Sequence, residues 1–166
     1  MPEKPVAYDV DGYDELTAAI ISLINEYPAL EAGEKFAFSV LNESSGKAMF
    51  PVSGAVISSI RTSITGFVQQ TCVYPFYIIY RAGGLSESRK KAVKEWLDNL
   101  GRWLELQSIT VGITAHKLDE YPTLTGGRRF TKFERTTPAY LDSINENNSE
   151  NWVISINAEY LNQYQK

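Results

Sequence analysis

The segment from Tyr74 to Gln107 constrains the fold of this chain more than any other part of the sequence. It begins with an apolar run, Tyr74-Pro-Phe-Tyr-Ile-Ile-Tyr-Arg81, and continues through Gly83-Gly84 into a long amphipathic stretch. Because β-branched and aromatic residues fill nearly every position from Phe76 to Tyr80, the run predicts an inner strand covered on both faces. Proline cannot donate a ladder hydrogen bond, so Pro75 is expected at the entrance of this strand.

The second half of the same segment predicts one long helix that packs on the sheet. Ser86 or Ser88 can accept hydrogen bonds from the free amides of the first turn. Apolar residues then recur at helical spacing: Val93, Trp96, Leu97, Leu100 and Leu104. We expect Trp96 to be buried with this stripe. Trp103 lies off its centre, where it would either flank the core or face a partner.

A second amphipathic helix is predicted near the N-terminus. Asp11 is its expected cap, and Pro28 ends the pattern. Its apolar residues form a single stripe: Leu16, Ala19, Ile20, Leu23, Ile24 and Tyr27. This helix is expected to pack beside the long one.

The remaining segments are assigned from alternation and from turn residues. The expected strands are residues 36–41, 57–70 with a bulge at Gly66, 74–81, 108–114, 128–135 and 152–160. Residues 47–54 show no period and predict a loop or protruding arm, residues 138–144 predict a short helix, and residues 145–151 predict an exposed polar connection. The predicted fold class is therefore α+β, with a mixed or mostly antiparallel sheet and two main helices packed on it as a single domain, 1–166.

Composition indicates a globular chain and limits the chemistry it can perform. The hydrophobic share is 43%, and no apolar run approaches the length of a membrane span. The N-terminal residues lack the apolar core of a signal peptide, so we expect the protein in a reducing cytoplasm. Cys72, the single cysteine, is expected to be a packed core residue.

Charge is distributed unevenly along the chain, whose net charge is −4. Residues 1–35 hold eight acids and two bases (−6), residues 36–137 eight acids and thirteen bases (+5), and residues 138–166 four acids and one base (−3). Such segregation either favours head-to-tail contact between copies or reflects a mixed surface.

No catalytic constellation is visible in the sequence, and we expect neither an enzyme nor a bound cofactor or metal. His116 is the only histidine and lies in a polar stretch that predicts an exposed loop. A zinc site needs clustered ligands, and there is no Gly-x-Ser-x-Gly elbow. Gly83-Gly84 matches neither of the phosphate-binding glycine patterns, so a tight connection is the better interpretation.

The candidate functional residues are four cations on the predicted strand 128–135: Arg128, Arg129, Lys132 and Arg135. Interleaved with Phe130 and Phe133, they could contact phosphates or stack on bases. In an acidic chain, however, a solvated strand face or a protein contact is favoured, and we expect no sequence-specific nucleic-acid binding. We hypothesise that the four make subunit or tube contacts. On this hypothesis, replacing Arg128 and Arg129 by Glu leaves thermal stability nearly unchanged and weakens assembly.

Taken in order, these elements resemble the minor capsid or tail-terminator proteins of long-tailed bacteriophages. The likeness covers most of the chain: a helix, strands, Tyr-Pro-Phe-Tyr-Ile-Ile-Tyr-Arg, Gly-Gly, a long Trp-containing helix, an Arg/Lys-rich strand and a closing Trp-x-Ile-x-Ile-x-Ala-x-Tyr strand. It rests on size and element order, so no residue role is transferred from that family.

This resemblance implies a virion protein of the phage tail or neck, assembled in the host cytoplasm. Its copies would form a ring, commonly of six, that stops tail-tube growth and joins tail to head. The implied partners are further copies, the tail-tube protein and the head–tail connector proteins, with DNA passing through the ring and no membrane involved. Irregular arms at 42–56 and 115–128 would reach neighbouring copies. The alternative is a monomeric cytoplasmic adaptor or inhibitor that binds one protein partner.

Overall fold

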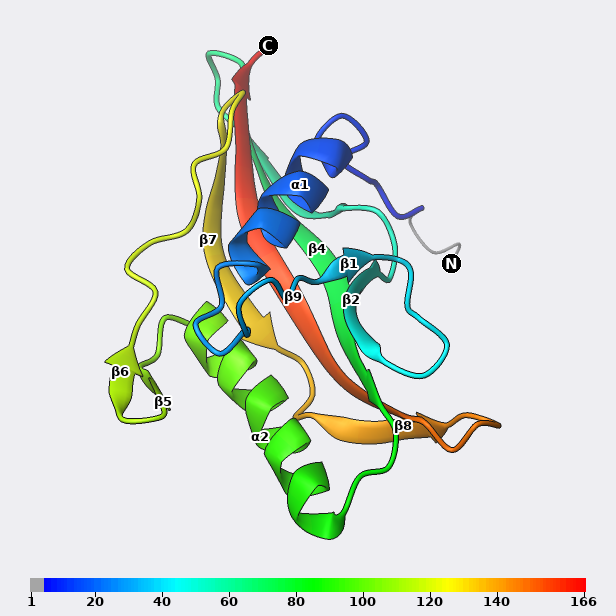
Figure 1. Cartoon of the computed structure of the whole chain (residues 1–166). Helices are drawn as coiled ribbons and strands as arrows, with labels where there is room; N and C mark the ends of the chain where they lie inside the picture. Colours follow the sequence, from blue (N-terminus) through cyan, green and yellow to red (C-terminus); the bar gives the residue numbers. More distant parts are fainter. Residues whose placement is uncertain (1–4) are drawn as a thin grey trace.

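Two long antiparallel strands form the axis of the molecule (Figure 1). The computed structural model describes residues 5–166. Within it, β4 (Phe67–Ala82) and β9 (Glu150–Gln165) are each 16 residues long and pair along their whole length, from Phe67 opposite Gln165 to Ala82 opposite Glu150. The remaining strands of this sheet pair directly with β4 or β9, except for one short strand.

The other strands are added on the two sides of this central pair. β2 (Gly46–Pro51) and β3 (Val56–Thr62) pair with β4, while β7 (Arg128–Arg135) and β8 (Tyr140–Ile144) pair with β9, all antiparallel. The short β1 (Ala37–Phe38) runs parallel to β2, and β5 (Ile109–Val111) with β6 (Thr114–His116) forms a separate two-stranded sheet.

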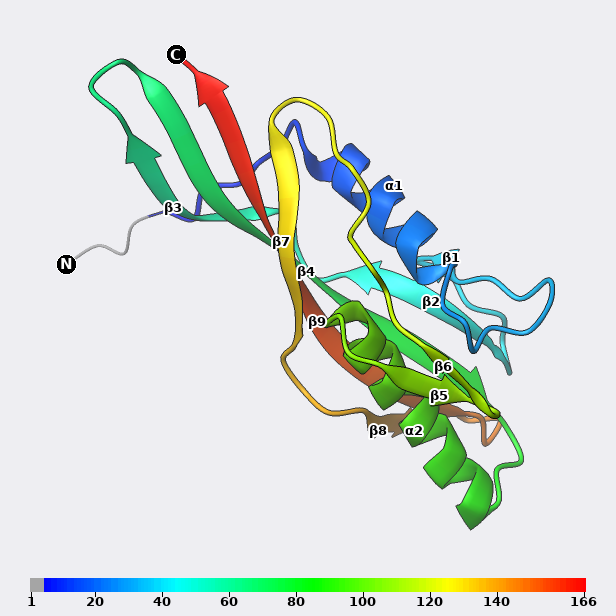
Figure 2. The same ribbon diagram turned by 90° about the vertical axis from the view of Figure 1, so that its left-hand side faces the viewer.

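The helices α1 (Tyr13–Ile24) and α2 (Glu87–Leu104) lie on the same face of the sheet, as Figures 1 and 2 show. Buried residues come from both helices and from the even-numbered positions of β4 and β9: Leu16, Ile20, Leu23, Val93, Leu97, Leu100, Ile78, Ile154 and Ile156. The predicted α+β fold class, with a mostly antiparallel mixed sheet and two helices packed on it, is confirmed.

The predicted cap is correct for α2 and wrong for α1. The Ser86 hydroxyl accepts a hydrogen bond from the Arg89 amide at 3.4 Å. In α1 the N-cap is Gly12, which has no side-chain group to cap the helix, and Asp11 makes no capping hydrogen bond. Instead, Asp9 accepts the Gly12 amide at 3.2 Å, so the carboxylate three residues before Gly12 serves the helix start.

The two tryptophans of α2 exchange the roles expected of them. Trp103 is 3% exposed and belongs to the core, whereas Trp96 is half-buried. The Trp96 indole donates to the carbonyl of Ala29 at 3.2 Å and packs edge-on against Tyr27 and Tyr80. Since Tyr27 follows α1 and its hydroxyl donates to the Trp96 carbonyl at 2.9 Å, Trp96 joins the segment after α1 to α2.

Pro75 lies in the middle of β4, so its expected place at the strand entrance is wrong. β2 ends at Pro51, opposite Phe76, and β3 begins at Val56, opposite Val73. On the side of β4 that faces β2 and β3, the Pro75 carbonyl accepts a hydrogen bond from the Val52 amide at 3.1 Å. The amide that proline lacks would point to the same side, into the gap between β2 and β3, so no ladder bond is lost.

Two predictions about residues 47–70 are also wrong. The expected loop at 47–54 contains β2, in which Met49 is fully buried opposite Ile78. The expected single strand over 57–70 is a hairpin, because the chain turns at residues 63–66, where Gly66 has φ +87°. Only the 37–38 part of the predicted strand 36–41 forms, and Ser39 after it has φ +53°.

The C-terminal third departs from expectation at three places. Residues 140–144 form strand β8 rather than a short helix, and β9 begins at Glu150 rather than at Trp152. The polar connection therefore ends inside the structure, where Ser149, Glu150 and Asn151 are buried. Likewise, the expected arm 115–128 packs on the core through Leu124, which is 8% exposed.

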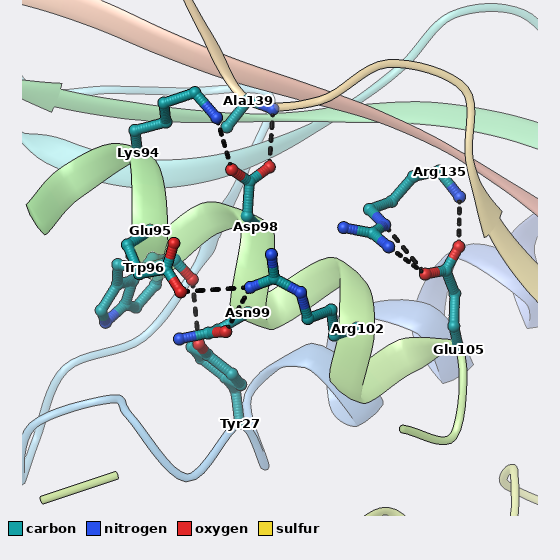
Figure 3. Close-up of polar contacts among 10 residues, drawn as sticks. All are labelled: Tyr27, Lys94, Glu95, Trp96, Asp98, Asn99, Arg102, Glu105, Arg135 and Ala139. Atoms are coloured by element: carbon teal, nitrogen blue, oxygen red, sulfur yellow. Dashed lines mark hydrogen bonds and ion pairs between the residues drawn. The ribbon is translucent and has the colours of Figure 1, made fainter. Parts of the chain in front are cut away.

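Polar contacts fix α2 against the β7–β8 side of the sheet (Figure 3). The Asp98 carboxylate accepts the Ala139 amide at 2.8 Å and the Lys94 ammonium at 2.7 Å. Burial alone would raise the pKa of Asp98, but these donors outweigh it and hold that pKa below its usual range. Asp98 is thus a buried anchor for the chain between β7 and β8.

Candidate interaction surface

The basic strand β7 directs its first cation into the molecule. The Arg128 guanidinium donates to both carboxylate oxygens of Asp9, at 2.9 and 2.8 Å, and these side chains are 13% and 6% exposed. The Tyr160 hydroxyl of β9 also donates to Asp9, at 2.6 Å. Three chain segments therefore meet at one buried carboxylate.

The surroundings of Asp9 favour its charged form. Desolvation raises the pKa of Asp9. The hydrogen bonds from Arg128 and Tyr160 and the charge of Arg128 together lower it by more, so the net shift is downward. The hydrogen bond to Asp9 raises the pKa of Arg128, and burial raises that of Tyr160. Asp9 and Arg128 are therefore both charged near neutral pH and form an ion pair.

The other three cations of β7 differ in how far they are neutralised. The Arg135 guanidinium contacts Glu105, at the end of α2, at 2.8 Å, as Figure 3 shows. Lys132 lies 3.3 Å from Glu134 and 3.9 Å from Glu159 on the exposed side of the strand. Arg129 is exposed and makes no ion pair within residues 5–166.

Arg128 and Arg135 are therefore neutralised by acidic partners and do not lie unpaired on a common surface with Arg129 and Lys132. Their contacts with Asp9 and Glu105 lie within one copy, and charge reversal at Arg128 would damage the fold itself. The predicted role of the four residues in subunit or tube contacts stays a prediction. Arg129 and Lys132 are the two that face solvent.

The outer edge of β7 is capped by side chains. On the side away from β9, the Phe133 amide donates to the Tyr121 hydroxyl at 3.2 Å, and the Arg135 amide donates to Glu105 at 3.1 Å. Tyr121 belongs to the irregular segment 117–127, which runs beside the strand. Amides that already have partners cannot pair with another strand, so this edge is closed.

The opposite edge, along β3, is different. The Ile57 amide donates outward to the Ala7 carbonyl at 2.9 Å, but in the described part of the chain nothing pairs with that edge beyond Ile57. The Ser63 amide donates inward to Phe67 at 2.8 Å. Since amides alternate along a strand, those of Ile60 and Thr62 point outward, and neither has a hydrogen-bond partner among the described residues.

Exposed apolar side chains gather at the same end of the molecule. Among the described residues, 14 large hydrophobic side chains are exposed, and seven lie on segments 6–10 and 60–67 or at Tyr164. Ile64, in the β3–β4 turn, is 107% exposed and Ile60 is 56% exposed. Figure 2 shows this hairpin projecting at the end of the sheet where β9 also ends.

A hollow of about 620 Å³ lies beside this apolar end. Its walls include Tyr8 and Ile57, and its polar groups include the buried amides of Gln70 and Asn162, 3.1 Å apart from oxygen to nitrogen. Tyr164 accepts the other Gln70 hydrogen bond at 3.4 Å. The hollow also borders Asp9, Asp11 and Arg128, of which Asp9 and Arg128 are already paired with each other, while the neutral amides and the hydroxyl can hydrogen-bond to a neighbouring segment.

Cys72 lies in β4 of the main sheet and His116 in β6 of the separate two-stranded sheet, so the single cysteine and the single histidine do not form a catalytic pair. Cys72 is fully buried, as predicted, and burial raises the pKa of its thiol to about 11. His116 lies in strand β6 and is half-buried, so its predicted place in an exposed loop is wrong. Among the described residues, no three or more His, Cys, Asp and Glu side chains are grouped to hold a metal ion.

Comparison with known proteins gives no assignment: neither a protein-family model nor a curated protein matches this chain. Within the described residues, neither helix is long and apolar enough to cross a membrane. The β3 edge was not predicted, and the single strand expected over residues 108–114 is wrong, because the chain turns there to form the β5–β6 hairpin. The turn residues Gly66 and Gly112, each between short β-prone runs, are the sequence signals that could have located both hairpins.

Proposed function

We propose that this chain is a structural protein of a tailed bacteriophage. Its copies form a ring at the head-proximal end of the tail, which terminates tail-tube growth and joins tail to head. The observation that carries the proposal is the outward-facing β3 edge beside the exposed apolar end, in a sheet whose other edge is capped at β7. An open edge with exposed apolar residues suits a chain that works by contacting other chains.

The proposed partners follow from this role. They are further copies of the chain, the tail-tube protein and the head–tail connector proteins, with DNA passing through the ring. A net charge of −4 agrees with contact through protein surfaces rather than sequence-specific nucleic-acid binding. The α+β fold seen here is the one that the sequence resemblance implies for such a subunit.

Two measurements test the proposal. A phage whose copy of this gene is disrupted should produce tails of abnormal length that do not attach to heads, and supplying the chain in trans should restore both. Size-exclusion chromatography with light scattering, followed by electron microscopy, should show rings, alone or on purified tail tubes. Normal tails in the disrupted phage would refute the proposal. A one-to-one complex with a single host protein would support the adaptor alternative.

A further inference from the structure

The β5–β6 hairpin is the one pair of described strands outside the main sheet. It consists of three residue pairs, from Ile109 opposite His116 to Val111 opposite Thr114. Ile109 is buried against the body of the molecule, whereas Ile113 in the turn is 101% exposed. An isolated two-stranded hairpin is marginally stable in water, so a further strand or surface would stabilise it.

The outer strand of this hairpin has an edge that can pair. In a hairpin with a two-residue turn, Val111 and Thr114 exchange backbone hydrogen bonds, so the amide and carbonyl of Ala115 point away from β5. No strand pairs with that side of β6 in the described residues. β5 is the strand nearer to α2, and β6 lies outermost at the left of Figure 1.

The β6 edge and the β3 edge are chemically compatible. The outward groups of β3 belong to Ile60 and Thr62, and β6 (Thr114–His116) contains no Asp, Glu, Lys or Arg side chain. The single charge in residues 58–62 is Arg61, so pairing these strands places no like charges opposite each other. The exposed Ile113 would also gain apolar neighbours beside Ile60 and in the β3–β4 turn.

We propose that β6 of one copy adds as a further strand to the outer edge of β3 in the next copy. The inference rests on the proposed assembly into a ring and names its contact. The two edges lie far apart in one copy, as both views show, so β6 cannot pair with β3 of its own copy. Because donor and acceptor are different surfaces of the same chain, the contact is head-to-tail, and repeating it gives the proposed ring where the rotation between copies closes.

Cross-linking between isotope-labelled copies tests the contact directly. A photoreactive residue replaces Ile113, whose full exposure makes this change neutral for the single copy. Equal amounts of ¹⁴N and ¹⁵N protein are mixed, assembled and irradiated, and the cross-linked peptides are identified by mass spectrometry. We expect cross-links of mixed isotope content between position 113 and residues 56–67. Mixed cross-links to other segments only, or none, would overturn the inference.

A pair of blocking variants tests the polarity of the contact. Ile60→Lys places a charge on β3, and Ala115→Pro removes the outward amide of β6. Because the Ile60 and Ala115 side chains are exposed, both variants should still fold. Each variant alone should lose the ring. Their mixture should give a two-chain complex, because one intact edge of each kind remains. Val40→Lys is the control, because Val40 is 61% exposed and lies on neither edge.

These outcomes separate the inference from the proposed function. Rings that persist in both blocking variants would overturn the β6–β3 contact and leave the ring proposal intact. Assembly that survives Ala115→Pro but not Ile60→Lys would indicate a two-fold β3–β3 contact and would also overturn it. Mixed cross-links from 113 to β3, found with normal tails in the disrupted phage, would support the contact and refute the phage role.

Discussion

The buried pair between Arg128 and Asp9 yields the sharpest stability prediction for this protein. Arg128→Met keeps much of the apolar stem and removes the guanidinium. The Asp9 side chain, which is 6% exposed, then lacks its counter-charge. Breaking a buried ion pair by removing one partner costs about 3–5 kcal/mol. For a chain of 166 residues, each kcal/mol lowers the melting temperature by roughly 2–4 °C, so the expected loss is roughly 6–20 °C.

Arg129→Met is the matched control. Arg129 neighbours Arg128 on the same strand, is exposed and makes no ion pair within the described residues, so its replacement should change stability by about 0.5 kcal/mol or less. Thermal melts of both variants, followed by circular dichroism and checked by urea titration, measure the difference. If Arg128→Met melted within about 2 °C of the wild type, the ion pair would not hold the N-terminal segment as the structure indicates.

The same pair predicts how stability depends on pH. The folded-state pKa of Asp9 is lowered, so its contribution is present above the unfolded pKa of about 3.9 and is lost as pH falls through the folded value. In Arg128→Met the burial of Asp9 is no longer offset by that cation, and its pKa should rise. The stability gap between variant and wild type should therefore narrow as the pH falls, first through the raised pKa of Asp9 in the variant and then through its lowered pKa in the wild type.

Three further predictions follow from packing. Trp103→Ala should cost about 3–5 kcal/mol in urea titrations, and Trp96→Ala should cost less because its ring is half-buried; equal costs would contradict the assigned core. Cys72 is fully buried with a raised thiol pKa, so a thiol reagent should modify it slowly in native protein and fast in denaturant; rapid native labelling would be inconsistent with this. Gly127→Ala should lower the melting temperature more than Gly84→Ala. Both glycines have positive φ, but only at Gly127 would the new methyl collide with a backbone carbonyl of β9.

Long periodic segments were predictable because a single physical signal decides them. The stripes of α1 and α2 and the alternation of residues 152–160 correspond to observed elements, with the core at the expected residues apart from Trp96. Short elements were not predictable from local pattern. Strand β2 exists because Met49 fits opposite Ile78 of a long neighbour, and β8 exists because β9 extends beyond Trp152 to pair with it. Tertiary pairing decides such segments, and a single sequence does not reveal it.

The candidate site was misjudged at one structural feature, a bulge in β7. Regular alternation from Arg128 would place Phe130 and Lys132 on the side of Arg128. The register shifts between Phe130 and Lys132, however, so that Phe130 and Phe133 are both buried. Two buried aromatics three positions apart on one strand require such a shift, and this spacing was visible in the sequence.

That shift divides the four cations of the strand. Arg128 and Arg135 lie on the same side as the two phenylalanines and meet Asp9 and Glu105, while Arg129 and Lys132 turn outward. Charge reversal at Arg128 would thus lower stability and assembly together and could not separate the two effects. Arg129→Glu changes only the surface. If it weakened assembly at unchanged melting temperature, most strongly at low salt, the predicted contact of this strand with another chain would gain support.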